Sequence, residues 1–233
     1  MSQAEKETIS VLRAAIGKKY VLTDQQSLEF YSMDVYRSFE IPIAVVQPGS
    51  VEELQEVVRV ATGLGMAIVV RGGGASYTDG YLPTTPKSIT IDTSRLNKIV
   101  EINEEDMFVT VESGVTWAEM AAALAEKNLR TPFWGPFSGL KATIGGSSSQ
   151  NSLSMGTSAY GGSPESILCY DIVLPSGEIL KTGSSSMENS SAFFRHYGPD
   201  LTGLFSGDSG ALGVKARITL RLIKLPTHTL TSS

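Results

Sequence analysis

Hydrophobic residues in the first hundred positions alternate between helical and strand spacing. Helical spacing predicts an amphipathic helix within 1–20, a helix over 27–36 opened by a capping box of Thr23 and Gln26, and a third helix opened by Ser50 and Glu53. Strands are predicted at 43–46, 66–70 and 88–91, and we expect 66–70 to be buried because all five residues are apolar. A strand, a helix of about a dozen residues and another strand form a βαβ unit, so these strands should be parallel.

The remainder of the chain is richer in hairpins. Strands predicted at 98–102 and 107–112 flank a polar turn, and strands at 167–174 and 178–181 flank Pro175-Ser176-Gly177. Thr116 and Glu119 form a capping box for a helix that ends near Asn128. Residues 214–223 alternate between apolar and polar types, which predicts an antiparallel strand with one solvated face. The chain therefore divides into two halves, each of mixed α/β structure.

Three consecutive glycines follow the strand predicted at 66–70. Gly72, Gly73 and Gly74 have no Cβ, so the backbone can adopt positive φ and its N–H groups can converge on a phosphate, with help from the hydroxyls of Ser76 and Thr78. The alternative is a tight turn between two strands. A dinucleotide-binding Rossmann turn is excluded for two reasons. The position of its third glycine is occupied by Tyr77, and Pro83 and Pro86 prevent the helix that should follow. A Walker loop is excluded because Gly80 precedes Tyr81 rather than lysine.

The segment 131–164 shows neither helical nor strand spacing. It holds seven glycines and eight serines, a composition found in functional loops and in disordered segments. Apolar residues such as Phe133, Trp134 and Tyr160 favour an ordered loop that wraps a ligand over a disordered one. Trp117 and Met120, in the preceding helix, are expected to pack in the core.

Composition narrows the class of protein. The 233 residues are 41% hydrophobic, and no apolar run is long enough to span a membrane. The net charge of −5 argues against a nucleic-acid partner and implies that a bound phosphate would be held by backbone amides. The single cysteine, Cys169, rules out an internal disulfide and fits a reducing compartment, so we expect a cytoplasmic location. We expect Cys169 to be a core residue rather than a nucleophile.

The sequence supports neither a metal site nor a serine hydrolase. His196 and His228 have no acidic or cysteine neighbours at metal-ligand spacing, so no metal site is expected. No G-x-S-x-G sequence supports a serine hydrolase. Glu104, Glu105 and Asp106 are interpreted as a solvated turn.

Four segments in order resemble the FAD-binding domain of the vanillyl-alcohol-oxidase and para-cresol-methylhydroxylase (PCMH-type) flavoproteins, in particular the D-lactate dehydrogenase and glycolate oxidase branch. The segments are IPIAVVQPGSVEELQEVVRVA, RGGGASYTDG, ATIGGSSSQNSLSMGTSAYG and LFSGDSGALGVKARITLRL. The resemblance covers roughly residues 20–225. It implies an α+β fold with a parallel βαβ subdomain over about 20–97 and a mainly antiparallel subdomain over about 98–225, with FAD between them.

The resemblance also implies which residues contact FAD. The pyrophosphate would lie at Gly72–Ser76, the flavin and ribityl chain at Thr143, Ile144 and Gly146, and the adenosine at Gly213 and Val214. The full set of expected contacts is Arg71, Gly72, Gly73, Gly74, Ala75, Ser76, Gly80, Pro136, Thr143, Ile144, Gly146, Ser149, Gly156, Tyr160, Gly213 and Val214. Lys141 is either a residue near the flavin that favours its anionic reduced form or a plain surface lysine.

Two departures from the family pattern matter. Relatives that attach FAD covalently often have histidine directly after the glycine loop, where this chain has Ala75, so we expect non-covalent FAD. The family's second half is a cap domain that builds the substrate pocket. We expect 1–233 to be one FAD-binding domain without a cap, so that Phe133, Trp134 and Phe137 line an exposed rim and the chain pairs with a cap subunit or a second copy.

Three hypotheses follow. The first is an FAD-linked oxidase or dehydrogenase domain whose flavin accepts a hydride from a small organic substrate, such as a 2-hydroxy acid. The second is a flavin-binding subunit without turnover of its own, which needs a partner cap protein. The third is a binding module for another nucleotide.

Overall fold

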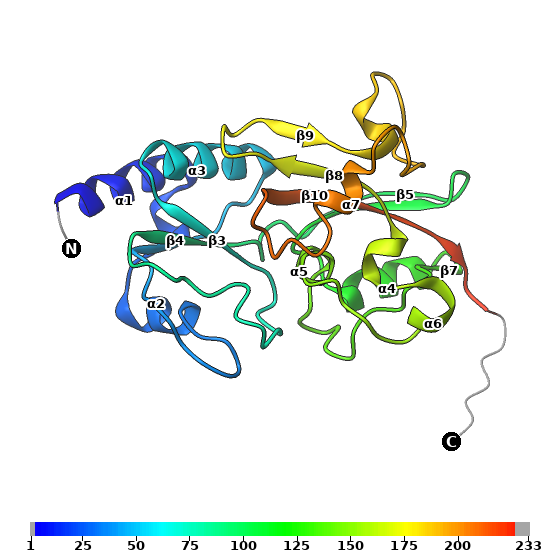
Figure 1. The fold of residues 1–233 in the computed structure, drawn as a ribbon, viewed down its shortest axis with the longest axis horizontal. Helices are drawn as coiled ribbons and strands as arrows, with labels where there is room; N and C mark the ends of the chain where they lie inside the picture. The colour runs from blue at the N-terminus through cyan, green and yellow to red at the C-terminus, as the bar shows by residue number, and fades with distance from the viewer. Residues whose placement is uncertain (1–2, 227–233) are drawn as a thin grey trace.

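The computed structural model describes residues 3–226, which form two α/β subdomains side by side (Figure 1). The first contains a four-stranded sheet of order β1-β2-β4-β3, and the second a five-stranded sheet of order β5-β6-β10-β8-β9. This arrangement confirms the α+β class and the division into a parallel and an antiparallel half.

The first sheet is mostly parallel. β2 and β3 each pair in parallel with β4, as the βαβ pattern predicts, while β1 pairs antiparallel with β2. The strands are β1 Val21–Leu22, β2 Ala44–Val46, β3 Ala67–Arg71 and β4 Ser88–Asp92. The helices are α1 Gln3–Ile16, α2 Gln25–Tyr31 and α3 Val51–Gly63, with a 3₁₀ turn at Lys18–Tyr20.

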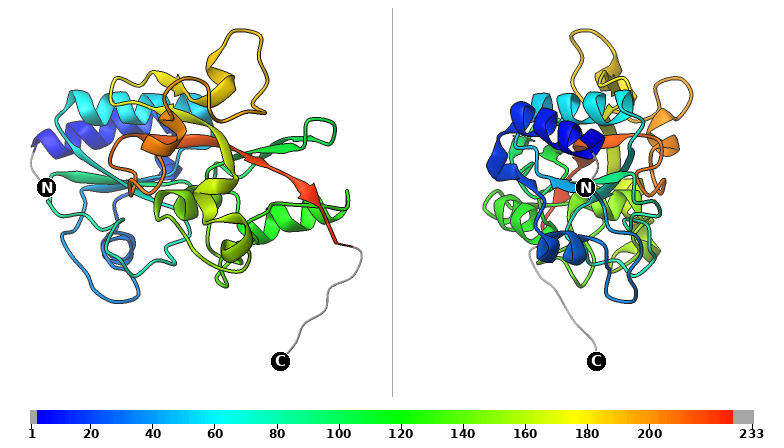
Figure 2. Two further views of the ribbon diagram at one scale, coloured as in Figure 1. Left: turned by 45° about the vertical axis from the view of Figure 1, so that its right-hand side comes forward. Right: turned by 90° about the vertical axis from the view of Figure 1, so that its left-hand side faces the viewer.

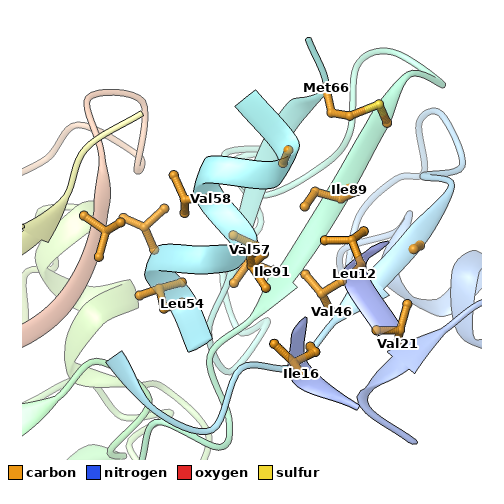
Figure 3. Close-up of a cluster of buried hydrophobic side chains, with 14 of the residues drawn as sticks. Leu12, Ile16, Val21, Val46, Leu54, Val57, Val58, Met66, Ile89 and Ile91 are labelled. Atoms are coloured by element: carbon orange, nitrogen blue, oxygen red, sulfur yellow. The ribbon is translucent and has the colours of Figure 1, made fainter. Parts of the chain in front are cut away.

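Helices α1 and α3 lie together on one side of this sheet, and α2 lies on the other (Figures 1 and 2). Figure 3 shows the buried side chains of α1 and α3 meeting those of the sheet: Leu12 and Ile16 from α1, Leu54, Val57 and Val58 from α3, and Ile89 and Ile91 from β4.

α3 also contacts the second subdomain. The Gln55 side-chain amide donates to the Gly177 carbonyl at 2.7 Å, and the Thr62 hydroxyl donates to the Pro175 carbonyl at 2.6 Å.

The second sheet is antiparallel throughout, and β10 is its central strand. Its strands are β5 Ile99–Asn103, β6 Phe108–Glu112, β8 Ile167–Val173, β9 Ile179–Lys181 and β10 Val214–Arg221, and a separate pair joins β7 Leu129–Arg130 to β11 Ile223–Lys224. The helices are α4 Trp117–Ala125, α5 Ile144–Ser149, α6 Thr157–Tyr160 and α7 Leu201–Leu204, with 3₁₀ turns at Ser163–Ser166 and Gly183–Ser186. Trp117 and Met120 lie in the core, as predicted.

Two capping predictions are confirmed and one is wrong. Ser50 and Thr116 accept hydrogen bonds from the amides of Glu53 and Glu119, and open α3 and α4. The N-cap of α2, however, is Asp24 rather than Thr23, because its carboxylate accepts from the Ser27 amide at 2.9 Å. α2 then ends at Tyr31, five residues earlier than the pattern predicts.

Two burial predictions are also wrong. β3 is an edge strand, so Ala67 is exposed and the next three residues are only half-buried. The predicted solvated face of β10 is only partly solvated: Lys215 and Thr219 are buried, whereas Arg217 is half-buried and Arg221 is exposed. Sequence alternation shows that polar residues share a face, but the elements that pack over the sheet decide whether that face meets water.

The segment 131–164 is ordered in the structure but not free of regular elements, because it contains α5 and α6. Phe133 is fully buried and packs edge-on against Trp117, whereas Trp134 and Phe137 are exposed. The prediction that Phe133 belongs to an exposed rim is therefore wrong. No helix among residues 3–226 is long and apolar enough to cross a membrane.

Candidate functional site

A cavity of about 490 Å³ lies between the two subdomains. Its walls come from the glycine loop and the residues after it (72–81), from the segment 136–154 that includes α5, and from residues 209–215 before and within β10. This size falls within the range of about 300–1,000 Å³ common for small-molecule and cofactor sites. The cavity is therefore the candidate site.

The glycine loop forms one wall and touches the second subdomain directly. A Cβ on Gly73 would overlap the backbone carbonyl of Lys141, and a Cβ on Gly72 would overlap the Thr143 hydroxyl. Gly74 has φ of 62°, in the region that glycine adopts most easily. The loop therefore needs glycine both for its conformation and for its close approach to the facing segment.

The residues after the glycines hold the loop in place. The Tyr81 hydroxyl lies 3.0 Å from the Gly74 carbonyl and 2.7 Å from the Ser76 carbonyl. The Thr78 hydroxyl donates to the Gln150 side-chain oxygen at 2.7 Å, which ties this segment to the residue that caps the end of α5. The cavity wall is thus joined across the two subdomains.

Arg71 lies behind the glycine loop. Its guanidinium faces the rings of Phe30, Tyr31 and Tyr81 at 5.1, 5.2 and 4.8 Å and donates to the Met33 carbonyl at 2.7 Å. It lines a second, more polar cavity of about 390 Å³ on the other side of Gly72 and Gly73. Burial lowers the pKa of Arg71, while the neighbouring tyrosines and acids oppose that shift.

The second cavity contains a compact hydrogen-bonded group centred on Asp92. Its carboxylate accepts from the Tyr31 hydroxyl at 2.5 Å and from the Gln47 side-chain amide at 2.7 Å. Burial raises the pKa of Tyr31, and the hydrogen bond to Asp92 raises it further. Tyr31 therefore stays a neutral hydrogen-bond donor at physiological pH.

Helix α5 forms the opposing wall of the main cavity. The Thr143 hydroxyl caps it by accepting from the Gly146 amide at 3.1 Å, and the Trp117 indole donates to the Ser147 hydroxyl at 2.7 Å. The Gly207 and Ser209 amides donate to the carbonyls of Ser148 and Ser149 at 2.8 and 2.9 Å. These bonds attach the loop before β10 to the same wall.

Buried polar groups close the inner part of the cavity. The Lys215 ammonium pairs with Asp208 at 2.6 Å, with both side chains almost fully buried. Burial lowers the pKa of Lys215, and the Asp208 carboxylate opposes that shift. The Lys215 ammonium also lies 5.6 Å from the ring centre of Tyr170, whose pKa burial raises to about 12.

Sequence reasoning missed Ser113 and Lys215, which both line this cavity. The one sequence feature that could have indicated Lys215 is a cation within a strongly apolar strand. Because this strand was expected to have a solvated face, a lysine in it looked ordinary. Ser113 gave no signal, because one serine after a strand is ordinary.

Most of the predicted contact residues come together here, and some do not. Those lining the main cavity are Gly72, Gly73, Gly74, Ala75, Ser76, Gly80, Pro136, Thr143, Gly146, Ser149 and Gly213. Arg71 lines the second cavity instead, and Ile144 and Val214 lie in the hydrophobic cores. Gly156 and Tyr160 line neither cavity.

The remaining candidates behave as ordinary structural residues. Cys169 is buried in β8, as predicted, and the Glu104–Asp106 turn is exposed. Lys141 is exposed; it lines the second cavity, and its backbone carbonyl meets Gly73. Between residues 3 and 226 there is no cluster of three or more His, Cys, Asp or Glu side chains that could hold a metal; His228 lies outside the described residues.

Residues 42–183, which contain the glycine loop and α5, match the model of the FAD binding domain. The chain belongs to this FAD-binding domain family. It is 31% identical over 98% of its length to the mitochondrial D-lactate dehydrogenase [cytochrome] of Arabidopsis thaliana, and 31% identical over 92% of its length to a D-2-hydroxyglutarate dehydrogenase of Xanthomonas citri pv. viticola. These alignments cover 39% and 44% of the two relatives, so the chain spans less than half of either.

The same fold occurs in solved structures of other proteins. A crystal structure of p-cresol methylhydroxylase with bound substrate superposes with a TM-score of 0.84 and 22% identity, over 98% of this chain and 45% of that one. The family resemblance inferred from the four sequence segments is thereby confirmed.

The cavity fits the FAD that the family binds. The glycine loop presents backbone without side chains, which suits a pyrophosphate, and the hydroxyl oxygens of Ser113 and Ser154 are buried without a hydrogen-bond partner among the described residues. Buried polar atoms without partners are uncommon in native proteins and often mark a place where a ligand or water binds. Both serines line the main cavity.

Proposed function

We propose that this chain is an FAD-dependent oxidoreductase domain that binds FAD non-covalently in the main cavity and whose substrate is a small 2-hydroxy acid. The observation that carries the proposal is the glycine loop, which is pressed against Lys141 and Thr143 and open to a cavity of cofactor size. The two relatives described above are named for the oxidation of D-lactate and D-2-hydroxyglutarate. Bound FAD would supply a two-electron acceptor for the hydrogen lost from the hydroxyl-bearing carbon.

The role of the protein's own residues is binding and orientation. The amides and hydroxyls of 72–76 would face the pyrophosphate, while Thr143 and Gly146 would approach the flavin and ribityl chain from the second subdomain. Phe137 is 88% and Leu153 69% exposed, and both line the cavity. They supply an apolar, solvent-accessible part of the wall on which a flat ring system can lie while a substrate reaches it.

The cavity supplies few groups for the substrate itself. Oxidation of a 2-hydroxy acid needs an acceptor for the hydroxyl proton and a cation for the carboxylate. Over residues 3–226, the ionisable side chains of the cavity wall are Tyr77, Tyr81 and Lys215; there is no histidine, aspartate, glutamate or arginine. For this reaction, such groups would be supplied by residues outside this wall.

This shortage supports a second candidate function, a flavin-binding unit whose substrate site is completed by a cap-domain subunit or by a second copy. Tyr77, Phe137 and Leu153 line the cavity and are largely exposed, so they form an apolar rim that such a partner could cover.

One series of measurements tests both candidates. The purified chain is titrated with FAD, and the visible absorption bands of protein-bound oxidised flavin are recorded. D-lactate, D-2-hydroxyglutarate or glycolate is then added without oxygen, with dithionite as the control for full reduction. Bleaching by a hydroxy acid supports the oxidoreductase proposal; binding without bleaching supports the incomplete flavin-binding unit. A chain that does not bind FAD refutes both.

Sedimentation of the same sample distinguishes the possible partners. A dimer whose dissociation abolishes reduction supports a second copy as the partner. A monomer that reduces its flavin at ordinary enzyme rates, roughly 1 per second or faster, refutes the need for any partner.

A further inference from the structure

The second cavity, of about 390 Å³, has no role in the proposed function. It shares only Gly72, Gly73 and Thr143 with the lining of the main cavity, so a molecule in it would not take the place of FAD. Its volume falls within the range of about 300–1,000 Å³ common for small-molecule sites. The side chains that line it show which kind of molecule it suits.

Two buried charges of opposite sign line this cavity. Arg71 is the last residue of β3 and Asp92 the last residue of β4, and the two are in register in the parallel pair. Arg71 is 6% exposed and Asp92 4% exposed. Parallel strands end at the same edge of a sheet, which brings both charges to one cavity.

The two charges do not neutralise each other. The Asp92 carboxylate accepts from three neutral donors, the Tyr31 hydroxyl, the Gln47 side-chain amide and the Ser94 backbone amide, at 2.5, 2.7 and 2.9 Å. The Arg71 guanidinium instead faces the Tyr31 ring at 5.2 Å. In the described part of the chain no ion pair joins Arg71 to Asp92. Tyr31 contacts both groups and occupies each of them separately.

Both charges keep bonding capacity. A guanidinium has five N–H donors, and the hydrogen bonds of the described residues use one of those of Arg71, to the Met33 carbonyl. A carboxylate has about four acceptor positions, and three of those of Asp92 are filled. The cavity therefore offers donors for an anionic group beside an acceptor for a cationic group.

The remaining lining adds an apolar rim and no net charge. Phe30 of α2 is 57% exposed, and Leu140 of the second subdomain is 84% exposed. Exposed Glu119 and Lys141 add one charge of each sign. The described lining thus holds two cations and two anions, which favours a ligand that carries both charges over a simple anion or cation.

We propose that the second cavity binds a free α-amino acid with an apolar side chain. Its carboxylate would contact Arg71, its ammonium Asp92, and its side chain the rim of Phe30 and Leu140. A ligand with only a carboxylate would gain from Arg71 but meet the negative charge of Asp92, and a ligand with only an ammonium would meet the reverse. The proposal goes beyond the proposed function and does not depend on FAD.

The test measures dissociation constants of the 233-residue chain at pH 7 by titration calorimetry, with three probes of the same carbon skeleton. Leucine carries both charges, leucinamide only the ammonium, and 4-methylpentanoate only the carboxylate. The variant is Asp92→Asn, which removes the charge and keeps the shape of the side chain. Asp171→Asn is the matched control, because Asp171 is a half-buried carboxylate of β8 that lines neither cavity.

We expect the wild-type chain to bind leucine roughly tenfold or more tightly than either analogue, because each analogue lacks one hydrogen bond between charged groups. Asp92→Asn should weaken leucine by roughly the same factor. The same variant should bind 4-methylpentanoate as tightly as the wild type or more tightly, because the repulsion of its carboxylate is removed. Asp171→Asn should leave all three probes unchanged, and saturating FAD should not displace leucine.

Three results would overturn the proposal. They are no leucine binding up to about 10 mM, leucine binding no tighter than that of the analogues, and displacement of leucine by FAD, which would place the amino acid in the main cavity. If Asp92→Asn does not fold, the comparison of the three probes on the wild-type chain still decides. The FAD titration reports on the proposed function separately, so a chain that binds FAD but not leucine overturns this inference alone.

Discussion

The backbone carbonyl of Lys141 occupies the space where a Cβ of Gly73 would lie. The glycine loop of one subdomain and the segment before α5 of the other are therefore in contact at a point that tolerates no side chain. Gly73 has two functions: it leaves backbone open toward the cavity, and it lets the two walls of the cavity approach each other.

Replacing Gly73 by alanine should damage both binding and stability. The new Cβ meets backbone, which cannot rotate away as a side chain can, so the two walls must separate. We expect the free energy of unfolding to fall by about 1–3 kcal/mol, the usual cost of overpacking. FAD affinity should fall more than tenfold, because the widened cavity no longer holds the pyrophosphate between its walls. Urea unfolding and FAD titration measure the two effects.

Gly63→Ala is the matched control for that experiment. Gly63 ends α3, and a Cβ there would meet nothing within 4 Å. Alanine should leave FAD binding unchanged and alter stability by less than about 1 kcal/mol in the favourable direction. If Gly73→Ala behaves like Gly63→Ala, the close contact with Lys141 has no energetic importance.

We expect Arg71 to stabilise the glycine loop rather than to contact the cofactor. The guanidinium lies among three aromatic rings, and a Cβ at Gly74 would approach one of its nitrogens to 2.7 Å. Arg71→Met removes these cation–π contacts and leaves the Met33 carbonyl without its donor. We expect the free energy of unfolding to fall by roughly 2 kcal/mol and FAD affinity to fall less than in Gly73→Ala.

The opposite result would support the direct contact between Arg71 and FAD that the family resemblance implies. If Arg71→Met abolishes FAD binding while the cofactor-free chain unfolds at the wild-type urea concentration, the guanidinium contacts the phosphates. Arg59→Met serves as the control, because Arg59 forms an exposed ion pair with Glu56 on the surface of α3. Its effect on stability should remain within about 0.5 kcal/mol.

The difference between Gly73 and Ser113 shows what a sequence can reveal about this site. The glycine loop is visible in the sequence because consecutive glycines after an apolar strand form a local pattern with a local physical cause. The place of Ser113 in the cavity wall depends on its hydrogen bond to Ala216 of β10, and the buried ion pair of Lys215 depends on Asp208 in the preceding loop. Strand order is set by contacts distant in sequence, so neither residue could be identified from its neighbours.

The same reason explains the errors in the fold. Thr23 and Gln26 match the capping-box pattern, but the Asp24 carboxylate accepts from the Ser27 amide and caps α2. The sequence predicts that Phe133, Trp134 and Phe137 all line an exposed rim, since all three are large apolar residues of one loop. The contact with Trp117 buries Phe133, while the other two remain exposed.

FAD should leave the protein on acid denaturation. Among residues 3–226 no histidine or cysteine lines the main cavity, since Cys169 is buried in β8 and His196 lies elsewhere on the surface. Precipitation with trichloroacetic acid should therefore leave the yellow colour in the supernatant. A yellow pellet would contradict the prediction, and peptide mapping would then begin with the cavity phenols, Tyr77 and Tyr81.

Stability at alkaline pH should depend on Tyr170. Burial raises its pKa from 10.0 to about 12, so in the unfolded chain the phenol ionises at a lower pH than in the folded protein. As pH rises from 10 to 12, ionisation favours the unfolded state, and stability is lost through that window; below pH 10 the phenol is neutral in both states and contributes no pH dependence. Two pKa units correspond to about 2–3 kcal/mol.

Tyr170→Phe isolates this contribution. The variant loses the hydrogen bond with the Ser206 hydroxyl at 3.1 Å, so at pH 8 it should be less stable than the wild type by about 1 kcal/mol. Because phenylalanine does not ionise, the gap should close and then reverse as the pH rises from 10 toward 12. Urea unfolding of both proteins at pH 8, 10 and 11 measures the difference directly, and other alkaline groups cancel in the comparison. A gap that stays constant over this range would show that the Tyr170 phenol ionises as readily in the folded protein as in the unfolded chain.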